Sequence, residues 1–216
     1  MYSFSKRLFD FSLAFALLPF AIAICFPFGA LFSLTTGEFP VFRQWRVGLN
    51  GKRFRIWKLR TMRESRCSNG KLLPDDERLT ALGWFLRKSS IDEMPQLVNI
   101  LMNDMSFVGP RPQIDEFLKA MTDEEKRRHD LIPGITGWAQ INGRNAMGWS
   151  ERFSLDLWYV NNASFSLDLQ ILLRTPFAIL GGVGVSREGH VSMPTIFEER
   201  PNGNISLTPD GGVGPR

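Results

Sequence analysis

Residues 11–34 read FSLAFALLPFAIAICFPFGALFSL, and this run decides the fold class because no charged side chain interrupts it. As a helix, it is long enough to cross the ~30 Å hydrocarbon core of a bilayer. It is too long for a signal peptide and offers no clear cleavage site. We therefore expect the N-terminal segment to contact a membrane.

The interior and the ends of this run indicate how it sits in the bilayer. Pro19 and Pro27 interrupt the helical pattern, and basic residues flank both ends, at positions 6–7 and from Arg43 onward. Basic flanks tend to stay on the cytoplasmic side of a membrane. Both ends are then cytoplasmic, which predicts a re-entrant, broken helix over residues 1–38, with a straight span as the alternative.

Composition limits the chemistry that the chain can support. The 216 residues suffice for one domain with a substantial core, and the net charge is +4. Nine lysines or arginines but a single acid lie between Arg43 and Arg66, a block that favours phosphate-bearing partners. Cys25 and Cys67 indicate no disulfide framework, so a reducing compartment is expected. With only two histidines, any metal is expected to be a hard cation such as Mg²⁺.

Local signals predict several elements after the membrane segment. Asn50-Gly51 stands between two extended runs, residues 41–48 and 53–62, and predicts a basic β-hairpin. Apolar residues at helical spacing predict a helix over residues 79–88, and a capping-box pattern predicts another over 122–129.

The second half of the chain carries further helical patterns. Residues 149–160 have an apolar stripe that includes Asp156, so this carboxylate needs a partner. Residues 167–185 are apolar and predict two short helices, either at the bilayer interface or in the core. Residues 201–216 are rich in Pro, Gly, Asn and Ser and predict a disordered tail.

The stretch SSIDEMPQL, residues 89–97, holds two adjacent carboxylates at the expected start of an apolar helix. Pro95 lacks an amide hydrogen and fits only among the first helical positions, so the helix is expected to begin near Asp92. An N-cap role alone would explain Asp92. The same position also favours an ionised, outward-facing carboxylate, so a reactive role is the alternative.

Six motifs follow one another along the chain: KRLFD (6–10), FRIWKLRTM (54–62), DEMPQL (92–97), MSFVGPRP (105–112), PGITGW (133–138) and NGR (142–144). Together they resemble the bacterial sugar transferases, and within them the small monotopic phosphoglycosyl transferases. The resemblance covers residues 5–176. Each motif alone is a weak signal, but six in this order are specific.

The resemblance implies a reaction. A phosphosugar would pass from a UDP-sugar to undecaprenyl phosphate, with release of UMP. Asp92 would attack the sugar-bearing phosphate and form a covalent aspartyl intermediate, which the lipid phosphate then displaces. Glu93 would bind the metal or position the lipid phosphate, and we expect Asp92 and Glu93 to hold Mg²⁺, which offsets repulsion between the reacting anions.

The resemblance also implies a fold and a location. The fold is expected to be mixed α/β and mostly helical, in a small monotopic membrane protein with a re-entrant helix over residues 1–38. A catalytic domain with interfacial amphipathic helices would follow over residues 39–186, and a C-terminal extension over 187–216. The protein is placed in the bacterial inner membrane, with the catalytic domain on the cytoplasmic face. The sugar stays open, with N-acetylated or diacetamido sugars favoured, and so does the oligomeric state.

Four cations are candidates for binding the diphosphate: Lys58, Arg87, Arg111 and Arg144. Prolines on both sides of Arg111 restrict its backbone and orient a planar guanidinium suited to phosphate. A membrane-facing position for Lys58 and a helix-capping role for Arg87 are the alternatives.

Two amides and two acids complete the candidate set. Gln140 and Asn142 are expected to contact the uracil or the sugar. Asp156 and Asp168 match acidic positions of the family. A structural salt bridge is the expected role of each, and holding one of the site arginines is the alternative.

Two other functions stay open at this point. Aromatic and basic residues interleave between residues 42 and 57, as in proteins that bind single-stranded nucleic acid. That function leaves the acidic pair at 92–93 unexplained, and the bilayer anchor already accounts for the basic block, so we expect no nucleic-acid partner. A membrane-bound UDP-sugar pyrophosphatase would share the nucleophile but use water as the acceptor.

Overall fold

The computed structural model describes residues 2–143, 147–180, 196–200, 205–207 and 213–215. Its longer elements are α1 (Tyr2–Thr36), β1 (Val41–Val47), β2 (Arg53–Leu59), α3 (Ala81–Ser89), α4 (Leu97–Leu101), α7 (Trp149–Asn162) and α8 (Phe165–Leu180). Its shorter elements are α2 (Asp75–Arg78), β3 (Ser106–Val108), α5 (Asp123–Lys126), β4 (Gly134–Thr136), α6 (Trp138–Ile141), α9 (Ile196–Glu199), β5 (Ile205–Leu207) and β6 (Val213–Pro215). The prediction of a mixed α/β fold that is mostly helical is confirmed.

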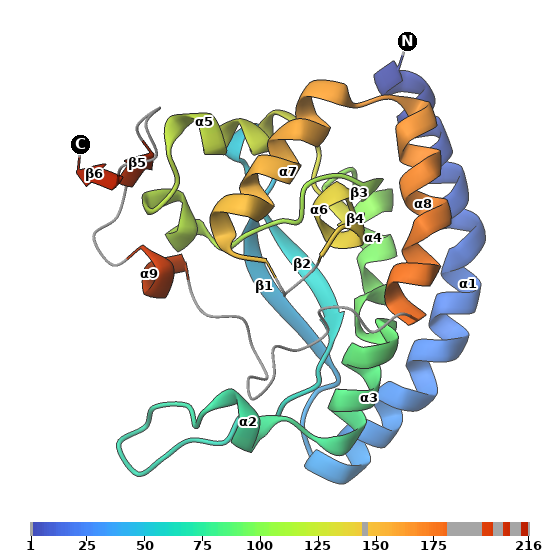
Figure 1. The fold of residues 1–216 in the computed structure, drawn as a ribbon. Coiled ribbons are helices and arrows are strands. Elements are labelled where there is room, and N and C mark those ends of the chain that lie inside the picture. Colours follow the sequence, from blue (N-terminus) through green and yellow to red (C-terminus); the bar gives the residue numbers. More distant parts are fainter. Residues whose placement is uncertain (1, 144–146, 181–195, 201–204, 208–212, 216) are drawn as a thin grey trace.

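The helix α1 runs along one side of the molecule (Figure 1). Large apolar side chains project from it into solvent, among them Phe15 and Phe20, which are 68% and 67% exposed. Within the described part of the chain, it is the one helix long and apolar enough to cross a membrane.

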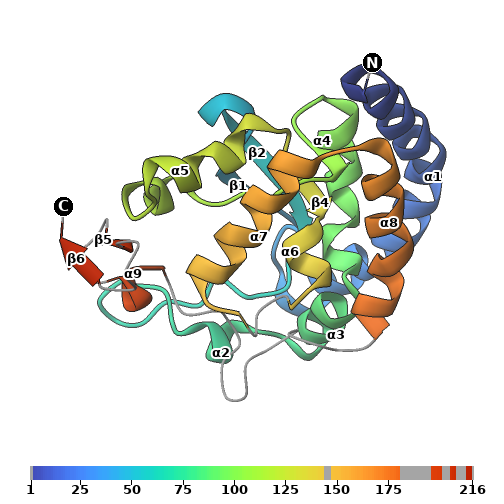
Figure 2. The same cartoon turned by 45° about the horizontal axis from the view of Figure 1, so that its top comes forward.

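The helix α1 continues through Pro19 and Pro27. Each proline removes one backbone hydrogen bond, and a long helix accommodates that loss by bending. The first half of α1 follows α8, and its C-terminal end lies beside α3 (Figures 1 and 2). The non-helical break expected near these prolines is therefore not observed, and a re-entrant path through a bilayer stays a prediction.

Charged residues near the start of α1 fasten it to the rest of the chain. The Nζ of Lys6 lies 2.6 Å from a carboxylate oxygen of Asp168 in α8. Arg7 donates hydrogen bonds to main-chain oxygens at the end of α4, and Asp10 accepts one from the backbone N–H of Phe107. This hydrogen bonding gives the charged residues at 6–10 a structural role.

The predicted β-hairpin is confirmed. Strands β1 and β2 pair antiparallel, from Val41 opposite Leu59 to Val47 opposite Arg53. The turn places Asn50 and Gly51 at φ values of 52° and 75°, the left-handed region that Asn and Gly adopt most readily. Because side chains alternate along a strand, the hairpin has two distinct faces.

One face of the hairpin carries alternating arginine and tryptophan side chains. The guanidinium of Arg43 lies 3.8 Å from the ring centroid of Trp57, and that of Arg55 lies 4.6 Å from Trp45. These cation–π contacts join residues that are directly opposite each other on the two strands. The basic block of the sequence is thus divided between this outer face and the inner face, which turns toward the site.

The helix α3 packs very closely on the end of β2. A Cβ added to Gly83 would lie 1.9 Å from the carbonyl oxygen of Thr61, so only glycine fits there. Thr80 caps the helix by accepting a hydrogen bond from the Gly83 N–H at 2.8 Å. The predicted helix over residues 79–88 is confirmed as α3, and this packing fixes its last turn relative to the hairpin.

The strands β3 and β4 form a short parallel pair, with Ser106 opposite Gly134 and Val108 opposite Thr136. A Cβ at Gly134 would lie 2.1 Å from the backbone nitrogen of Gly109, so glycine permits this close approach. The pair holds the segment after β3 against the segment after β4. Both segments contribute to the site described below.

The elements predicted from residue 122 onward are confirmed in part. The capping box is confirmed at α5, where Thr122 and Glu125 bond each other's backbone N–H groups. The helix predicted over residues 149–160 is observed as α7. The predicted pair of helices over 167–185 is instead one helix in its described part, since α8 continues through Pro176. The tail expected from residue 201 falls largely outside the described residues, and its described parts are β5 and β6, which pair antiparallel.

Candidate active site

A cavity of about 1100 Å³ lies between the hairpin, the segment after α3, the β3–β4 pair and α7. Seven of the predicted site residues line it, namely Lys58, Arg87, Asp92, Glu93, Arg111, Gln140 and Asp156. Leu17 and Phe20 of α1 and Ile179 of α8 form an apolar part of the wall. The cavity thus joins a charged interior to the two helices with exposed apolar faces.

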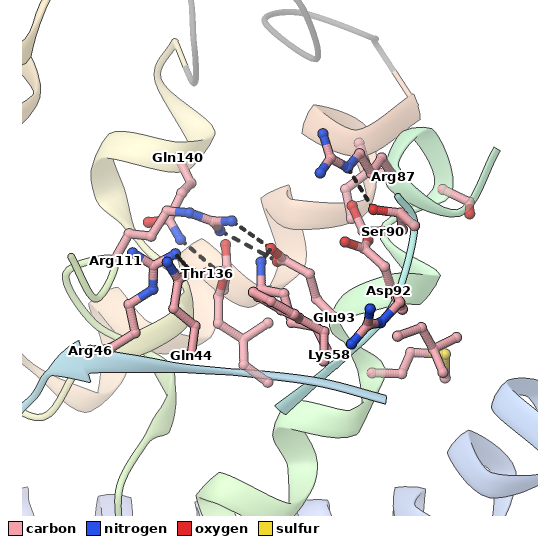
Figure 3. Close-up of a pocket in the computed structure, with 18 of the residues that line it drawn as sticks. Gln44, Arg46, Lys58, Arg87, Ser90, Asp92, Glu93, Arg111, Thr136 and Gln140 are labelled. Atoms are coloured by element: carbon pink, nitrogen blue, oxygen red, sulfur yellow. Dashed lines mark hydrogen bonds and ion pairs between the residues drawn. The ribbon is translucent and has the colours of Figure 1, made fainter. Parts of the chain in front are cut away.

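A tight turn presents the two adjacent carboxylates to the cavity. Ser90 ends α3 in the left-handed conformation, with φ 59°, and a 3₁₀ helix follows over Ile91–Gln96. The N-cap interpretation of Asp92 is wrong: Ser90 holds that position, and the first turn closes through a bond from the Glu93 N–H to the Ser90 carbonyl. A 3₁₀ helix advances about 120° per residue, so neighbouring side chains diverge. Figure 3 shows Asp92 and Glu93 pointing to different parts of the cavity.

Glu93 is held by two cations. Its Oε1 lies 2.6 Å from the Nζ of Lys58, and the Arg111 guanidinium donates to both of its carboxylate oxygens. Burial opposes ionisation of Glu93, but the charges of Arg111 and Lys58 and their hydrogen bonds outweigh it and hold the pKa of Glu93 well below its usual value. Glu93 is therefore a permanent anion that orients two cations.

Asp92 has a different environment. Its side chain is buried, with 7% exposure, and among the described residues no hydrogen bond or ion pair reaches its carboxylate. Burial and the charge of Glu93 raise the pKa of Asp92 to about 6, while more distant cations oppose the rise. Asp92 thus carries an unshielded carboxylate that is ionised at neutral pH.

Arg87 lies on the other side of Asp92, in the last turn of α3 (Figure 3). Its Nε donates to the Thr61 hydroxyl at 3.0 Å, which fixes the side chain along the cavity wall. Burial lowers the pKa of Arg87, and the charge of Asp92 opposes that shift. The guanidinium remains charged and keeps donors free for an anion near Asp92.

Sequence reasoning missed several cations that line the cavity, and Arg46 is the one beside Arg111. This side chain comes from the inner face of β1 and donates to the Gln44 side-chain oxygen at 2.7 Å. Burial, reinforced by the neighbouring charge of Arg111, lowers the pKa of Arg46 to about 10. Strand alternation could have identified Arg46 from the sequence. Residues 42, 44 and 46 lie on one face of β1, and Lys58 is directly opposite residue 42 on the same face of the hairpin.

The residues predicted to bind substrate from the loop after β4 differ in their position relative to the cavity. Gln140 lines the cavity and donates from its side-chain nitrogen to the Ile135 carbonyl at 2.9 Å. Asn142 donates to the Trp138 carbonyl and does not line the cavity. Arg144 lies outside the described residues.

The two supporting acids form structural ion pairs, as expected, with Arg128 for Asp156 and Lys6 for Asp168. Asp156 accepts from the Nε of the buried Arg128 at 3.1 Å, and the same guanidinium donates to the main-chain oxygen of Arg111 at 2.9 Å. Asp156 therefore supports Arg111 through an intermediary. Asp168 binds Lys6 and joins α8 to α1, away from the cavity lining.

No cluster of three or more acidic, histidine or cysteine side chains suited to a metal ion occurs among the described residues. Glu93 already binds two cations, whereas the carboxylate of Asp92 is open. The protein can thus offer few ligands, and a hard cation there would need phosphate oxygens from a substrate to complete its coordination.

Comparison with known proteins gives a consistent answer. Residues 1–182 match the family described as bacterial sugar transferase. The chain is 49% identical to the uncharacterized sugar transferase EpsL of Bacillus subtilis strain 168, over 87% of this chain and 93% of that protein.

Two further relatives are named for a reaction. The chain is 38% identical to the UDP-glucose:undecaprenyl-phosphate glucose-1-phosphate transferase of Escherichia coli K12, over 63% of this chain and 32% of that protein. It is 35% identical to the UDP-N-acetylgalactosamine-undecaprenyl-phosphate N-acetylgalactosaminephosphotransferase of Aeromonas hydrophila, over 85% of this chain and 45% of that protein. The chain spans less than half the length of these two relatives.

Proposed function

Because this chain belongs to the bacterial sugar transferase family, we propose that it transfers a phosphosugar from a UDP-sugar to undecaprenyl phosphate and releases UMP. Two relatives with this type of reaction in their names support the proposal. So does a cavity that combines cations for phosphate with an apolar wall on α1.

We assign Asp92 as the nucleophile because the two carboxylates differ in their ion pairing. Glu93 is held by Lys58 and Arg111, whereas Asp92 is buried, ionised and unpaired among the described residues. In the proposed first step, an Asp92 oxygen bonds to the sugar-bearing phosphorus. The bond from that phosphorus to the bridging oxygen breaks, and UMP leaves with the electron pair.

In the second step, an oxygen of the lipid phosphate bonds to the same phosphorus. The Asp92–phosphorus bond breaks, the carboxylate is regenerated, and the product is a lipid-linked diphosphosugar. No net proton transfer is needed in either step. The cations of the cavity lower the repulsion between the reacting anions.

We propose Mg²⁺ as the cofactor, with Asp92 and Glu93 as the acidic groups beside it. The open carboxylate of Asp92 fits such an ion, and the substrate diphosphate would supply most of the other oxygens. Bound Mg²⁺ would add charge compensation for the phosphates. Removal of metal with excess chelator is expected to abolish turnover, and full activity in chelator would contradict this assignment.

The location proposed is the cytoplasmic face of the bacterial inner membrane, where α1 anchors the chain. Leu17 and Phe20 belong to α1 and also to the cavity wall, so a lipid acceptor can approach from the bilayer. Exposed apolar residues on α8, such as Leu173 and Phe177, extend this surface.

A donor screen tests the proposal. Purified protein, undecaprenyl phosphate and Mg²⁺ are incubated with a panel of UDP-sugars, and UMP release and lipid products are measured. Formation of a lipid-linked diphosphosugar is expected with at least one donor. Release of free sugar phosphate instead would identify a pyrophosphatase, and no UMP release from any donor would contradict both.

Intact mass spectrometry tests the intermediate. With a reactive donor and no acceptor, the wild-type protein is expected to gain the mass of one phosphosugar, and Asp92→Asn is expected to gain none. Turnover without a detectable adduct at Asp92 would contradict the two-step route.

A further inference from the structure

Arg46 and Arg111 leave an excess of positive charge at the end of the cavity farther from Asp92. Arg46 and Arg111 line this end, Lys58 lies next to it, and Glu93 is the acid that binds Arg111 and Lys58. Among the described residues, no carboxylate lies within ion-pair distance of Arg46, and Gln44 is its hydrogen-bond partner. Glu93 and Glu116 act on the charge of Arg46 only from a distance.

The positions of these groups are ordered along the cavity. Figure 3 shows Arg46 and Arg111 together at one end, Glu93 with Lys58 in the middle, and Asp92 near Arg87 at the other end. The planar guanidinium of Arg111 is turned toward Glu93 by its two hydrogen bonds, while Arg46 is oriented by Gln44. Two adjacent guanidinium groups with one carboxylate between them suit a phosphate monoester.

The in-line geometry of phosphoryl transfer indicates which phosphate group occupies the end of the cavity at Arg46 and Arg111. This step rests on the proposed function. In phosphoryl transfer, the attacking and leaving oxygens lie on opposite sides of the phosphorus. When Asp92 attacks, the phosphate of UMP departs on the side away from Asp92. When the lipid phosphate displaces Asp92, it must approach from that same side.

We propose that Arg46 and Arg111 form one phosphate-monoester subsite, used first by the departing UMP and then by the lipid phosphate. Gln44 is a positioning residue that holds the Arg46 guanidinium toward this subsite. The two substrates of the reaction therefore compete for the same pair of arginines.

Steady-state kinetics with a UDP-sugar donor test the subsite. In a two-step mechanism with a covalent intermediate, UMP and the lipid phosphate bind the same enzyme form, so UMP inhibits competitively against the lipid. Arg46→Gln is expected to raise both the Ki of UMP and the KM of undecaprenyl phosphate by about tenfold or more, the loss that one charge-assisted phosphate contact predicts. Arg46→Lys is expected to give smaller increases in both.

A near-isosteric variant separates this role from a folding defect. Gln44→Glu keeps Arg46 but places a carboxylate beside it, which competes with a phosphate for the guanidinium. The Ki of UMP and the KM of undecaprenyl phosphate are therefore again expected to rise, while the melting temperature stays near that of the wild type. The matched control is Arg43→Gln, which removes an arginine from the outer face of the same strand and is expected to change neither constant.

The outcomes are distinct. A rise in the UMP constant alone, a rise in the lipid constant alone, or no change in either would overturn the shared subsite while leaving the proposed function intact. Absence of transfer by the wild-type protein would overturn the proposed function, and the inference with it.

Discussion

Asp92 and Glu93 are neighbours in the sequence, and a single 3₁₀ turn gives them opposite electrostatic surroundings. Glu93 faces Lys58 and Arg111 and stays ionised, whereas burial raises the pKa of Asp92. A carboxylate that is poorly stabilised as an anion is a better nucleophile than one shielded by two cations. Under the proposed function, the geometry thus separates the nucleophile from a group that orients cations.

Substitution of each acid is expected to have a different effect. Asp92→Asn removes the proposed nucleophile and is expected to lower UMP release by more than about 10³-fold. Glu93→Gln keeps the nucleophile but releases Lys58 and Arg111, so a loss of about 10²-fold is expected. UMP release assays measure both, with the exposed Asp123→Asn as control. Near-normal UMP release by Asp92→Asn would contradict its role.

Activity is expected to depend on pH through Asp92. Its pKa is raised from 3.8 to about 6, so the reactive anion is lost as the pH falls through this value and is fully present above it. The ratio kcat/KM for the UDP-sugar should therefore decrease about tenfold per unit below pH 6 and level off above pH 7. A constant kcat/KM between pH 5 and 8 would show that the pKa of Asp92 lies outside this range or that its anion is not needed.

Residue types and order predicted much of the site, but not its pairings. Asp92, Glu93, Lys58, Arg87 and Arg111 all line one cavity, as the motifs indicated. The sequence could not show which acid binds which cation, because these contacts join segments far apart in the chain. Arg128 illustrates this: it is a buried partner of Asp156 inside the stretch that the capping-box pattern predicts as a helix.

At the scale of elements, the close packing of α3 on the end of β2 positions Arg87. Gly83→Ala would place a methyl group 1.9 Å from the Thr61 carbonyl oxygen, so the backbone must separate there. We expect this separation to lower the free energy of unfolding by about 1–3 kcal/mol. Binding of the UDP-sugar is also expected to weaken, because Arg87 lies one turn after Gly83 in the same helix. Thermal melting and the KM of the UDP-sugar measure both effects. Lys88→Ala, at an exposed position of the same helix, is the control, and equal behaviour of the two variants would contradict the packing argument.

The short helix α9 and the residue after it form a clasp beyond the family-matched region. Arg200 binds both carboxylate oxygens of Glu125 at 2.8 Å and donates to the Ser150 hydroxyl, and Ile196 is fully buried beside Trp149. Trp149 also lines the cavity. The clasp therefore supports one wall of the site from behind.

Arg200→Ala is expected to lower stability by about 2 kcal/mol, because Glu125 then stays half-buried without its cation. A thermal melt of the full chain measures the change. Lys126→Ala removes a neighbouring cation whose ion pair with Asp123 is exposed, and it is expected to have little effect. Equal melting temperatures for the Arg200 variant and the wild type would show that the clasp does not stabilise the fold.

Local signals explain which elements were predictable. The hairpin was found because Asn50-Gly51 is a short-range turn signal, and α3 because its apolar residues recur at helical spacing. The β3–β4 pair was not found, since three-residue strands that join Ser106 to Gly134 have no local signature. The 3₁₀ helix before α4 was read as an α-helix because two turns are too short for the period to distinguish.

At the scale of the whole molecule, the re-entrant path of α1 remains to be tested. In a variant without native cysteines, Cys25→Ala with Cys67→Ser, single cysteines are introduced at Ser5 or at Ser68. Both are expected to react with a membrane-impermeant maleimide only from the cytoplasmic side. Reaction of the two positions from opposite sides would identify a spanning helix. Composition predicted membrane contact, but a continuous helix such as α1 is compatible with either path.

The apolar part of the cavity wall has a kinetic consequence under the proposed function. Leu17 and Phe20 bring the anchor helix up to the reacting groups, so the acceptor need not transfer its hydrocarbon tail into water, at a cost of ~0.8 kcal/mol per methylene. Encounter is then a search in two dimensions by lateral diffusion. The velocity should follow the surface density of the acceptor in the leaflet, and dilution with inert phospholipid should slow the enzyme even when the bulk amounts of every reactant are unchanged.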